Sequence, residues 1–260
     1  MKIGIFDSGF GGLEILKEAV KKLPSYDFVF LGDTKRAPYG NRSKESIYEF
    51  TEQAVKFLFK KDCLLIILAC NTVSADALKK IQLKYRKKKV LGVIIPASEE
   101  AVERTKNKRI GVLATERTVK SKAFPREINK IDKKIKVFQE ACPLLAPIIE
   151  SGEKDSKITE IYLKERLKAF KDIDVLVLGC THYGLLENKI KKLTKNITII
   201  SEGKIVAEKL KQYLKRHPEI EKNLSKRSKK EFFSTDITLN FKKLGSQFFG
   251  QKINPKKVSL

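Results

Sequence analysis

The stretch LLIILACNT, from Leu64 to Thr72, decides the fold, because six apolar residues in a row lead directly into Cys70 and two polar residues. An apolar run of this length without polar alternation is typical of a strand in a parallel sheet that helices bury on both faces. The stretch VLVLGCTH, from Val175 to His182, repeats the pattern with Cys180 in the place of Cys70. The sequence therefore predicts an internal duplication with a cysteine after a buried strand in each half.

Short apolar runs alternate with amphipathic segments along the rest of the chain, which predicts alternating strands and helices. The expected strands cover Lys2–Phe6, Phe28–Leu31, Leu64–Ala69, Val90–Val93, Arg109–Leu113, Ile135–Gln139, Val175–Leu178, Ile197–Ile200 and Glu231–Ser234. The expected helices cover Leu13–Leu23, a segment capped by Ser43 and running toward Phe59, Ser74–Tyr85, Thr118–Ile131, Leu144–Ser151, Ile158–Phe170, Leu186–Leu193, Gly203–Leu214 and Leu239–Phe248. This alternation predicts an α/β fold with parallel sheets covered on both faces.

The composition is that of an ordinary globular chain, with 260 residues of which 42% are hydrophobic. No apolar run approaches the roughly 18 residues that a membrane-spanning helix needs. The N-terminus lacks the long apolar core of a signal peptide. We therefore expect a cytoplasmic protein.

The formal net charge of +24 is large, and such a charge can serve binding to nucleic acid or to an acidic surface. Lysine is spread along the whole chain, however, and the densest clusters, Lys84–Lys89 and Lys226–Lys230, carry little aromatic interleaving. No recognisable nucleic-acid module accompanies them. A nucleic acid is therefore not expected as the primary partner, and a basic binding protein remains the alternative from a different class.

The four cysteines, Cys63, Cys70, Cys142 and Cys180, form no C-x-x-C pair, and the chain has only two histidines. A zinc site is therefore not expected, and in a reducing cytosol the thiols are expected to be free. Cys63 and Cys142 are interpreted as buried structural residues, because free cysteine is among the most buried residue types. For Cys70 and Cys180 the paired context favours a reactive role.

Two further strand ends carry unusual loops, DSGFGG at Asp7–Gly12 and GDTKRAPYG at Gly32–Gly40. Glycines between a strand and a helix let backbone N–H groups approach an anion, although a tight turn alone would also explain the first loop. The G-x-G-x-x-G spacing of dinucleotide-binding loops is missing. Ligands of parallel α/β sheets bind at the carboxyl ends of the strands, which is where these loops and the two cysteines are expected.

Two thiols on opposite walls of a cleft suit the racemisation of a free amino acid. The reaction removes the α-proton from one face and returns a proton to the other, so one group serves as base and the opposite group as acid. A free thiol has a pKa of about 8.5, and a helix N-terminus directly after each cysteine would favour the thiolate. Because the α-proton is far less acidic than a thiol, the site must also stabilise a developing carbanion.

Four motifs together resemble those of the glutamate racemases, within the aspartate/glutamate racemase superfamily: DSGxGG at Asp7–Gly12, GDTxxxPYG at Gly32–Gly40, ACNTxS at Ala69–Ser74 and GCTHY at Gly179–Tyr183. The resemblance covers nearly the whole chain. It implies interconversion of L- and D-glutamate without a cofactor, which supplies D-glutamate for peptidoglycan. It also implies two pseudo-symmetric three-layer domains with the active site in the cleft between them, residues 1–95 plus 207–260 on the Cys70 side and residues 96–206 on the Cys180 side.

The resemblance further implies roles for single residues. Cys70 would take the proton from D-glutamate with the help of Asp7. Cys180 would take the proton from L-glutamate with the help of His182, which Glu150 orients. The carboxylates and ammonium of the substrate would be held by Ser8, Pro38, Tyr39, Gly40, Asn71, Thr72, Thr115, Thr118 and Thr181. One departure is Ser201-Glu202-Gly203, where the family often has Asp-Ser before a glycine.

Alternatives remain open at this point. The paired cysteines do not by themselves exclude a racemase that acts on aspartate or another acidic amino acid, and comparing the turnover of L-glutamate and L-aspartate would decide. The oligomeric state is left open by the sequence, with a homodimer as one option. No metal is expected in the site.

Overall fold

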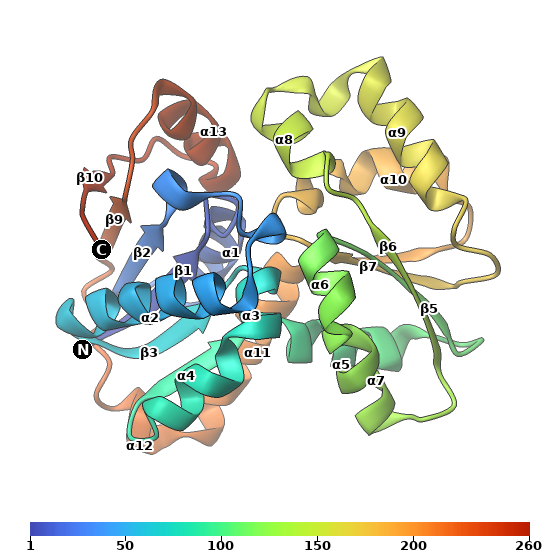
Figure 1. Cartoon of the computed structure of the whole chain (residues 1–260). Coiled ribbons are helices and arrows are strands. Elements are labelled where there is room, and N and C mark those ends of the chain that lie inside the picture. Colours follow the sequence, from blue (N-terminus) through green and yellow to red (C-terminus); the bar gives the residue numbers. More distant parts are fainter.

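Two lobes face each other across the middle of the molecule, and each is built around its own sheet (Figure 1). The computed structural model describes residues 1–260, apart from the side chains of residues 239 and 240. Every strand pair in the described chain is parallel. The predicted α/β class with largely parallel sheets in two domains is therefore confirmed.

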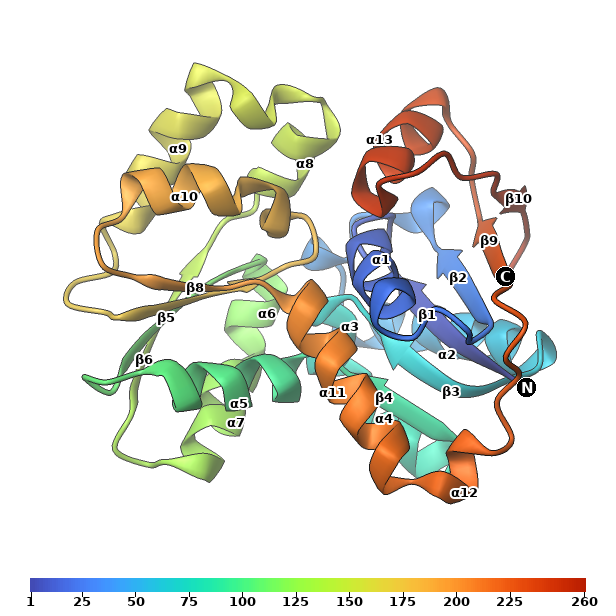
Figure 2. The ribbon, with the colours of Figure 1, turned by 180° about the vertical axis from the view of Figure 1, so that it is seen from behind.

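The first sheet contains both the start and the end of the chain. Its strand order is β10 (Lys256–Lys257), β9 (Lys230–Ser234), β2 (Phe28–Gly32), β1 (Lys2–Asp7), β3 (Cys63–Leu68) and β4 (Lys89–Gly92). Helices α1 (Leu13–Lys22), α11 (Glu202–Arg216) and α13 (Leu239–Phe249) lie on one side, and α2 (Lys44–Lys60), α3 (Asn71–Asp76) and α4 (Leu78–Lys84) lie on the other (Figure 2). Phe6 pairs with Leu68, so the loops after β1 and β3 leave the same edge of the sheet side by side.

The second sheet has the strand order β6 (Lys136–Ala141), β5 (Arg109–Ala114), β7 (Val175–Gly179) and β8 (Thr198–Ile200). In Figure 1, α8 (Leu145–Glu150), α9 (Lys157–Leu167) and α10 (Glu187–Leu193) lie above it, and α5 (Ile94–Arg104), α6 (Glu116–Ser121) and α7 (Ala123–Ile131) lie below it. Ala114 pairs with Gly179, which aligns the loops after β5 and β7. Both sheets are thus enclosed by helices, as their almost entirely apolar central strands require.

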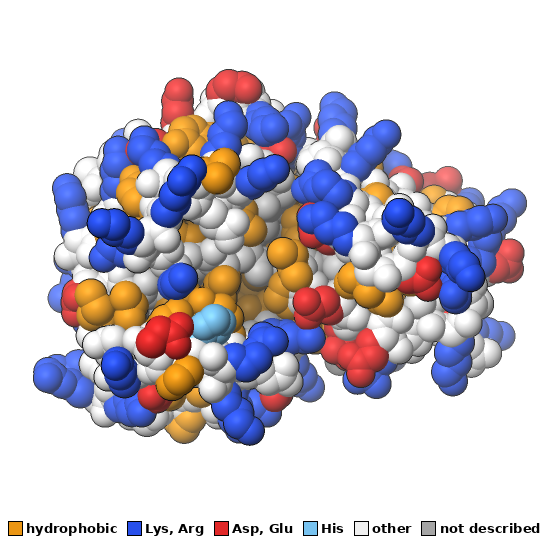
Figure 3. All heavy atoms as spheres, turned by 90° about the horizontal axis from the view of Figure 1, so that it is seen from below, with side chains coloured by type: hydrophobic (Ala, Val, Ile, Leu, Met, Phe, Trp, Pro, Cys, Tyr) orange, Lys and Arg blue, Asp and Glu red, His pale blue; other side chains and the backbone are white. Residues whose placement is uncertain are grey.

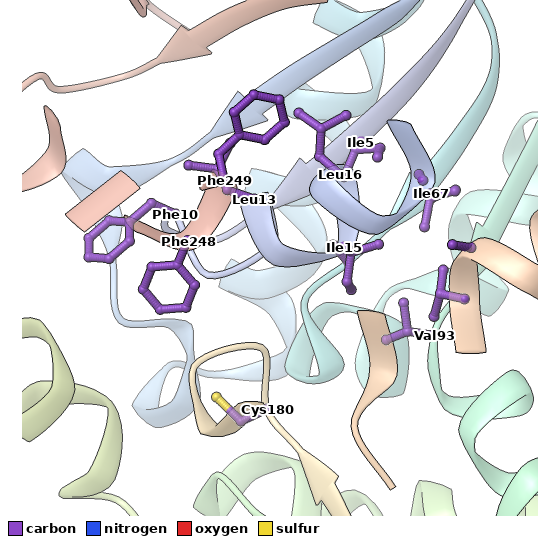
Figure 4. Close-up of a cluster of buried hydrophobic side chains, with 14 of the residues drawn as sticks. Ile5, Phe10, Leu13, Ile15, Leu16, Ile67, Val93, Cys180, Phe248 and Phe249 are labelled. Atoms are coloured by element: carbon purple, nitrogen blue, oxygen red, sulfur yellow. The ribbon is translucent and has the colours of Figure 1, made fainter. Parts of the chain in front are cut away.

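A continuous apolar core joins the two lobes. It runs from the first sheet through α1 into the second lobe, where it includes Leu176 and Leu178 of β7. Figure 4 shows Leu16 of α1 beside Ile5 of β1, with Phe10 nearer to the turn that carries Cys180. Because this core is shared, the strand ends of the two sheets are held in a defined relation to each other.

Several helices differ from the sequence prediction. The segment expected as one helix over Ser74–Tyr85 is divided at Ala77, and the segment expected over Thr118–Ile131 is divided at Lys122, whose φ is 53°. The sequence prediction assigned no element between the strands Val90–Val93 and Arg109–Leu113, and the structure has helix α5 there. Proline is tolerated in the first turn of a helix, where Pro96 lies.

The remaining connections are short. Four single 3₁₀ turns in the described chain cover Thr34–Arg36, Tyr39–Asn41, Glu153–Asp155 and Tyr183–Leu186. Within the charged stretch after α11, Pro218 opens the short helix α12 (Pro218–Glu221). None of the helices described is long and apolar enough to cross a membrane.

Candidate active site

A cavity of about 290 Å³ lies between the two lobes, at the carboxyl ends of strands from both sheets. Of the residues expected at the site, all except Asp7 and Thr118 line this cavity. The lining residues are Ser8, Gly9, Ala37, Pro38, Tyr39, Gly40, Cys70, Asn71, Thr72, Thr115, Ala146, Pro147, Glu150, Gly179, Cys180, Thr181 and His182. The two thiols that the sequence pairs across 110 positions thus reach one enclosed space.

Cys70 occupies the turn between β3 and α3, and it is the residue that precedes the first turn of α3. Its thiol is 9% exposed, and burial raises the pKa to about 12, with a further increase from the charge of Asp7. The hydroxyl of Ser8 donates a hydrogen bond to the Cys70 sulfur at 3.3 Å, and the backbone N–H of Val73 donates another. Both hydrogen bonds favour the thiolate, so they partly offset the rise in pKa that burial causes.

Asp7 ends β1 and is fully buried behind the cavity wall. Its Oδ2 atom accepts a hydrogen bond from the backbone N–H of Gly9 at 3.0 Å, whereas Oδ1 has no partner among the described residues. Burial raises the pKa of Asp7, and the charge of His182 opposes that rise. Asp7 therefore lies behind the cavity wall, where its charge raises the pKa of Cys70 and its Oδ2 holds the start of the loop that bears Ser8.

On the opposite wall, Cys180 follows β7 directly. Its sulfur lies 3.8 Å from Nδ1 of His182, and Nε2 of the same ring lies 2.8 Å from Oε1 of Glu150 at the end of α8. Burial alone would lower the pKa of His182, but the hydrogen bonds to Cys180 and Glu150 outweigh it and raise the pKa to about 10. A protonated imidazole next to a sulfur stabilises the thiolate, as in other histidine-paired cysteines.

Aromatic side chains from the first lobe hold the His182 ring. Phe10 and Phe248 each pack edge-on against it, with ring centroids 5.6 Å away. A β-carbon on Gly11 would lie 2.5 Å from Oγ1 of Thr181 and 2.9 Å from Nδ1 of His182. The loop after β1 is therefore in direct contact with the turn after β7, and only glycine leaves room for it.

Hydroxyl groups gather on the remaining wall. Thr115 caps α6, and its Oγ1 lies 2.9 Å from that of Thr72 and 3.0 Å from that of Thr118. Thr118 is fully buried behind the other two, so it is placed to orient Thr115 and not to touch a ligand. The hydroxyl of Tyr39 donates to the carboxylate of Asp33, which fixes the Pro38–Gly40 segment at the rim.

Sequence reasoning did not single out Glu202 as a site residue. This carboxyl group begins α11, is 5% exposed and accepts a hydrogen bond from Nδ2 of Asn71 on the cavity wall. The two residues are 131 positions apart, so only the fold brings them together. In the part of the chain that is described, no group of three or more His, Cys, Asp or Glu side chains is arranged to hold a metal ion.

Comparisons with known proteins agree with this geometry. Residues 12–210 match the family model described as Asp/Glu/hydantoin racemase. A glutamate racemase of Sulfurihydrogenibium is 38% identical over 100% of this chain and 98% of its own length. A glutamate racemase of Aquifex aeolicus is 37% identical over the same shares.

Solved structures give the same result. A glutamate racemase isoform from Bacillus anthracis superposes with a TM-score of 0.92 at 35% identity, covering 100% of this chain and 97% of that one. The glutamate racemase of Francisella tularensis, solved in complex with D-glutamate, also has a TM-score of 0.92, at 33% identity, over 99% of this chain and 97% of its own.

Proposed function

The chain belongs to the glutamate racemases of the Asp/Glu/hydantoin racemase family, and we propose that it interconverts L- and D-glutamate by moving the α-proton between Cys70 and Cys180. As an amino-acid racemase it is an isomerase. The observation that carries the proposal is that both thiols line one enclosed cavity, each from the carboxyl end of a strand in a different sheet.

In the direction from L- to D-glutamate, the Cys180 thiolate removes the α-proton and becomes a thiol. The Cys70 thiol then gives its proton to the opposite face of the α-carbon and becomes a thiolate. The two sulfurs exchange these roles in the reverse direction. His182 stabilises the charged form of Cys180, while Ser8 and the N–H of Val73 stabilise the charged form of Cys70.

The polar wall supports binding of an acidic amino acid. The substrate carries two carboxylates and one ammonium, and the cavity offers hydroxyl donors from Ser8, Thr72, Thr115 and Thr181. Held in a small space, these donors can also stabilise negative charge that develops at the α-carboxylate as the proton leaves. The Francisella protein bound to D-glutamate supports glutamate as the ligand.

Serine substitution at each thiol tests the mechanism. C70S and C180S should each lower kcat by roughly 10²–10⁴-fold, the usual contribution of a positioned acid–base group. In deuterated water, each variant should place deuterium mainly in the enantiomer whose own thiol remains, L-glutamate for C70S and D-glutamate for C180S. C63A is the matched control, since Cys63 is also a buried free cysteine but is not part of the cavity wall. Equal exchange into both enantiomers by both variants would refute the division between the two faces.

We propose in addition that the reaction needs neither metal nor organic cofactor. The side chains at the cavity supply an acid and a base for the two faces, and the hydroxyl donors on its wall can stabilise the charge that develops as the proton leaves. D-Glutamate formation by the purified protein should therefore be unchanged after dialysis against a chelator, and a loss of activity restored by a divalent metal would refute this. L-Aspartate assayed in parallel should be turned over far more slowly than L-glutamate.

The cellular role follows from the family. We propose that the D-glutamate produced supplies peptidoglycan synthesis in the cytoplasm, with no membrane or nucleic acid as primary partner. On the face shown in Figure 3, lysine and arginine side chains are spread over both lobes. Depletion of the protein in its host should produce a growth defect that added D-glutamate relieves.

A further inference from the structure

Glu202 is a buried carboxyl group behind Asn71 of the cavity wall, and the proton-transfer mechanism does not use it. Its Oε2 accepts a hydrogen bond of 2.8 Å from Nδ2 of Asn71, and its Oε1 has no partner among the described residues. Asn71 is the first residue of α3, directly after Cys70, and it lines the cavity. The first turn of α11 is thus joined to the first residue of the helix that directly follows one of the two thiols.

Burial of this carboxyl group is unfavourable for folding. Moving a carboxyl out of water without full hydrogen bonding costs free energy, and the nearby carboxyl groups of Glu14 and Asp7 make its ionised form less favourable still. An apolar side chain of similar volume would fill the same space without that cost. The position of Glu202 is therefore better explained by what it does to Asn71 than by stability.

The hydrogen bond determines which end of the buried Asn71 amide is left without a partner. An asparagine side chain has one carbonyl acceptor and one NH₂ donor at opposite ends of a planar group. With Nδ2 donating to Glu202, the carbonyl Oδ1 is the end that remains, and it has no partner in the described structure. Of the charged groups on an amino-acid substrate, only the ammonium can donate to such an oxygen.

We propose that Glu202 is a positioning residue that holds the Asn71 amide so that Oδ1 accepts a hydrogen bond from the substrate ammonium. The inference rests on the proposed function, since it assumes an amino acid in the cavity. Without Glu202 the amide is free to turn and present its N–H groups toward the ammonium. Both groups are hydrogen-bond donors, so no hydrogen bond would form between them. Substrate binding would then weaken while the two thiols remained in place.

Replacing Glu202 with a side chain of similar size but no acceptor tests this. E202M should raise KM for both enantiomers by roughly tenfold, the effect of losing a hydrogen bond to a charged group, and should change kcat much less. E202Q retains a carbonyl acceptor and should keep KM close to that of the unchanged protein. S201A, at the same helix end, is the control and should leave KM unchanged, since the Ser201 side chain makes no hydrogen bond with Asn71.

A ligand that lacks the ammonium separates positioning from a general structural effect. Glutarate has the two carboxylates of glutamate without the amino group, so its inhibition constant should be the same for E202M and the unchanged protein. In an N71A background, E202M should have no further effect on KM, because the two residues act as one unit. E202A, measured in parallel, carries the same tests if E202M does not fold.

Three results would overturn the inference: unchanged KM in E202M, equal loss of glutamate and glutarate binding, or E202Q as impaired as E202M. Additive effects of N71A and E202M on KM would also overturn it. None of these results concerns glutamate turnover by the unchanged protein, so none of them tests the proposed function. Only absence of racemisation by the unchanged protein would refute the proposed function itself.

Discussion

At His182, two opposite effects act on one imidazole. Burial disfavours the charged ring, whereas Cys180 on one side and Glu150 on the other favour it, and the outcome is a pKa of about 10. Near neutral pH the ring is therefore protonated in the folded state, with a donor directed at each partner. An imidazole held in this form can stabilise the thiolate on its side of the cavity without being consumed in the reaction.

The Glu150–His182 pair predicts a specific pH dependence of stability. A histidine has a pKa of about 6.5 when unfolded, and here the folded value is higher, so the charged ring stabilises the fold. This stabilisation is fully present below about pH 6.5 and is lost as the pH rises through about 10. E150Q should lower the folded pKa, so its deficit in unfolding free energy should be largest near pH 6 and shrink toward pH 10.

Urea unfolding of both proteins at pH 6, 8 and 10 measures this deficit. E219Q provides the control, because Glu219 also pairs with a histidine, His217, at 3.0 Å but on the exposed surface. Exposed pairs contribute little, so E219Q should show almost no deficit at any of the three pH values. A deficit in E150Q that stays constant from pH 6 to pH 10 would contradict the account of His182.

Single site residues could be predicted from the sequence only where a short local motif marks them. Cys70 and Cys180 could be identified because each directly follows an apolar strand in the same short pattern. Thr118 was grouped with the residues expected to hold substrate, but its side chain is fully buried behind Thr115. Glu202 was noticed only as part of a departure from the family pattern, because its contact with Asn71 on a distant segment leaves no local signal in the sequence.

Between elements, the loop that joins β1 to α1 makes a close contact with the opposite lobe. Gly11 in this loop lies against Thr181 and His182 of the turn after β7, so G11A would force the two turns apart. Overpacking of this kind costs about 1–3 kcal/mol of stability, and the displaced His182 should lower kcat/KM for L-glutamate much more than a change remote from the site. Steady-state kinetics and urea unfolding of G11A measure the two effects.

G250A separates loss of activity from loss of stability. Gly250 ends α13 with a φ of 81°, a conformation that costs an alanine about 1–2 kcal/mol. This residue does not line the cavity. G250A should therefore lose stability similar to that of G11A while keeping its kcat/KM, and equal kinetic losses in the two variants would show that the Gly11 contact has no special role.

Strands and helices were predictable where a single hydrophobic pattern covers the whole element. They were not predictable where the chain bends and divides a helix in two. Strands β3 and β7 are apolar runs with clear ends, so both lie within one residue of the expected positions. The division of a helix at Lys122 leaves no trace in the hydrophobic periodicity, because the apolar face continues across the break. Helix α5 was not among the expected helices, and the proline in its first turn is a residue that also occurs in loops.

For the whole molecule, the important question is what keeps the two lobes together around the cavity. The shared apolar core behind α1 does so on one side. On the other side an ion pair joins α3 to α6: the guanidinium of Arg117 donates to both carboxylate oxygens of Asp76, through Nε to one and through an NH₂ group to the other. Helices α3 and α6 follow Cys70 and Thr115 respectively, so this pair closes the lobes close to the reacting groups.

Removing the Arg117 cation should weaken the contact between the two lobes at this edge of the cavity. The side chain of Asp76 is only 4% exposed, so R117A leaves a buried carboxylate without its partner, and stability should fall by about 1–3 kcal/mol. KM for glutamate should rise as well, because the substrate must then supply the free energy of holding the lobes together.

R104A is the matched control. Its partner Glu100 lies on the same helix, and Arg104 is 59% exposed, so stability should change by no more than about 0.5 kcal/mol and KM should not change. Urea unfolding and initial rates over a range of L-glutamate concentrations measure both quantities, and an R117A protein with the KM of R104A would show that this ion pair stabilises the lobes without governing the cavity between them.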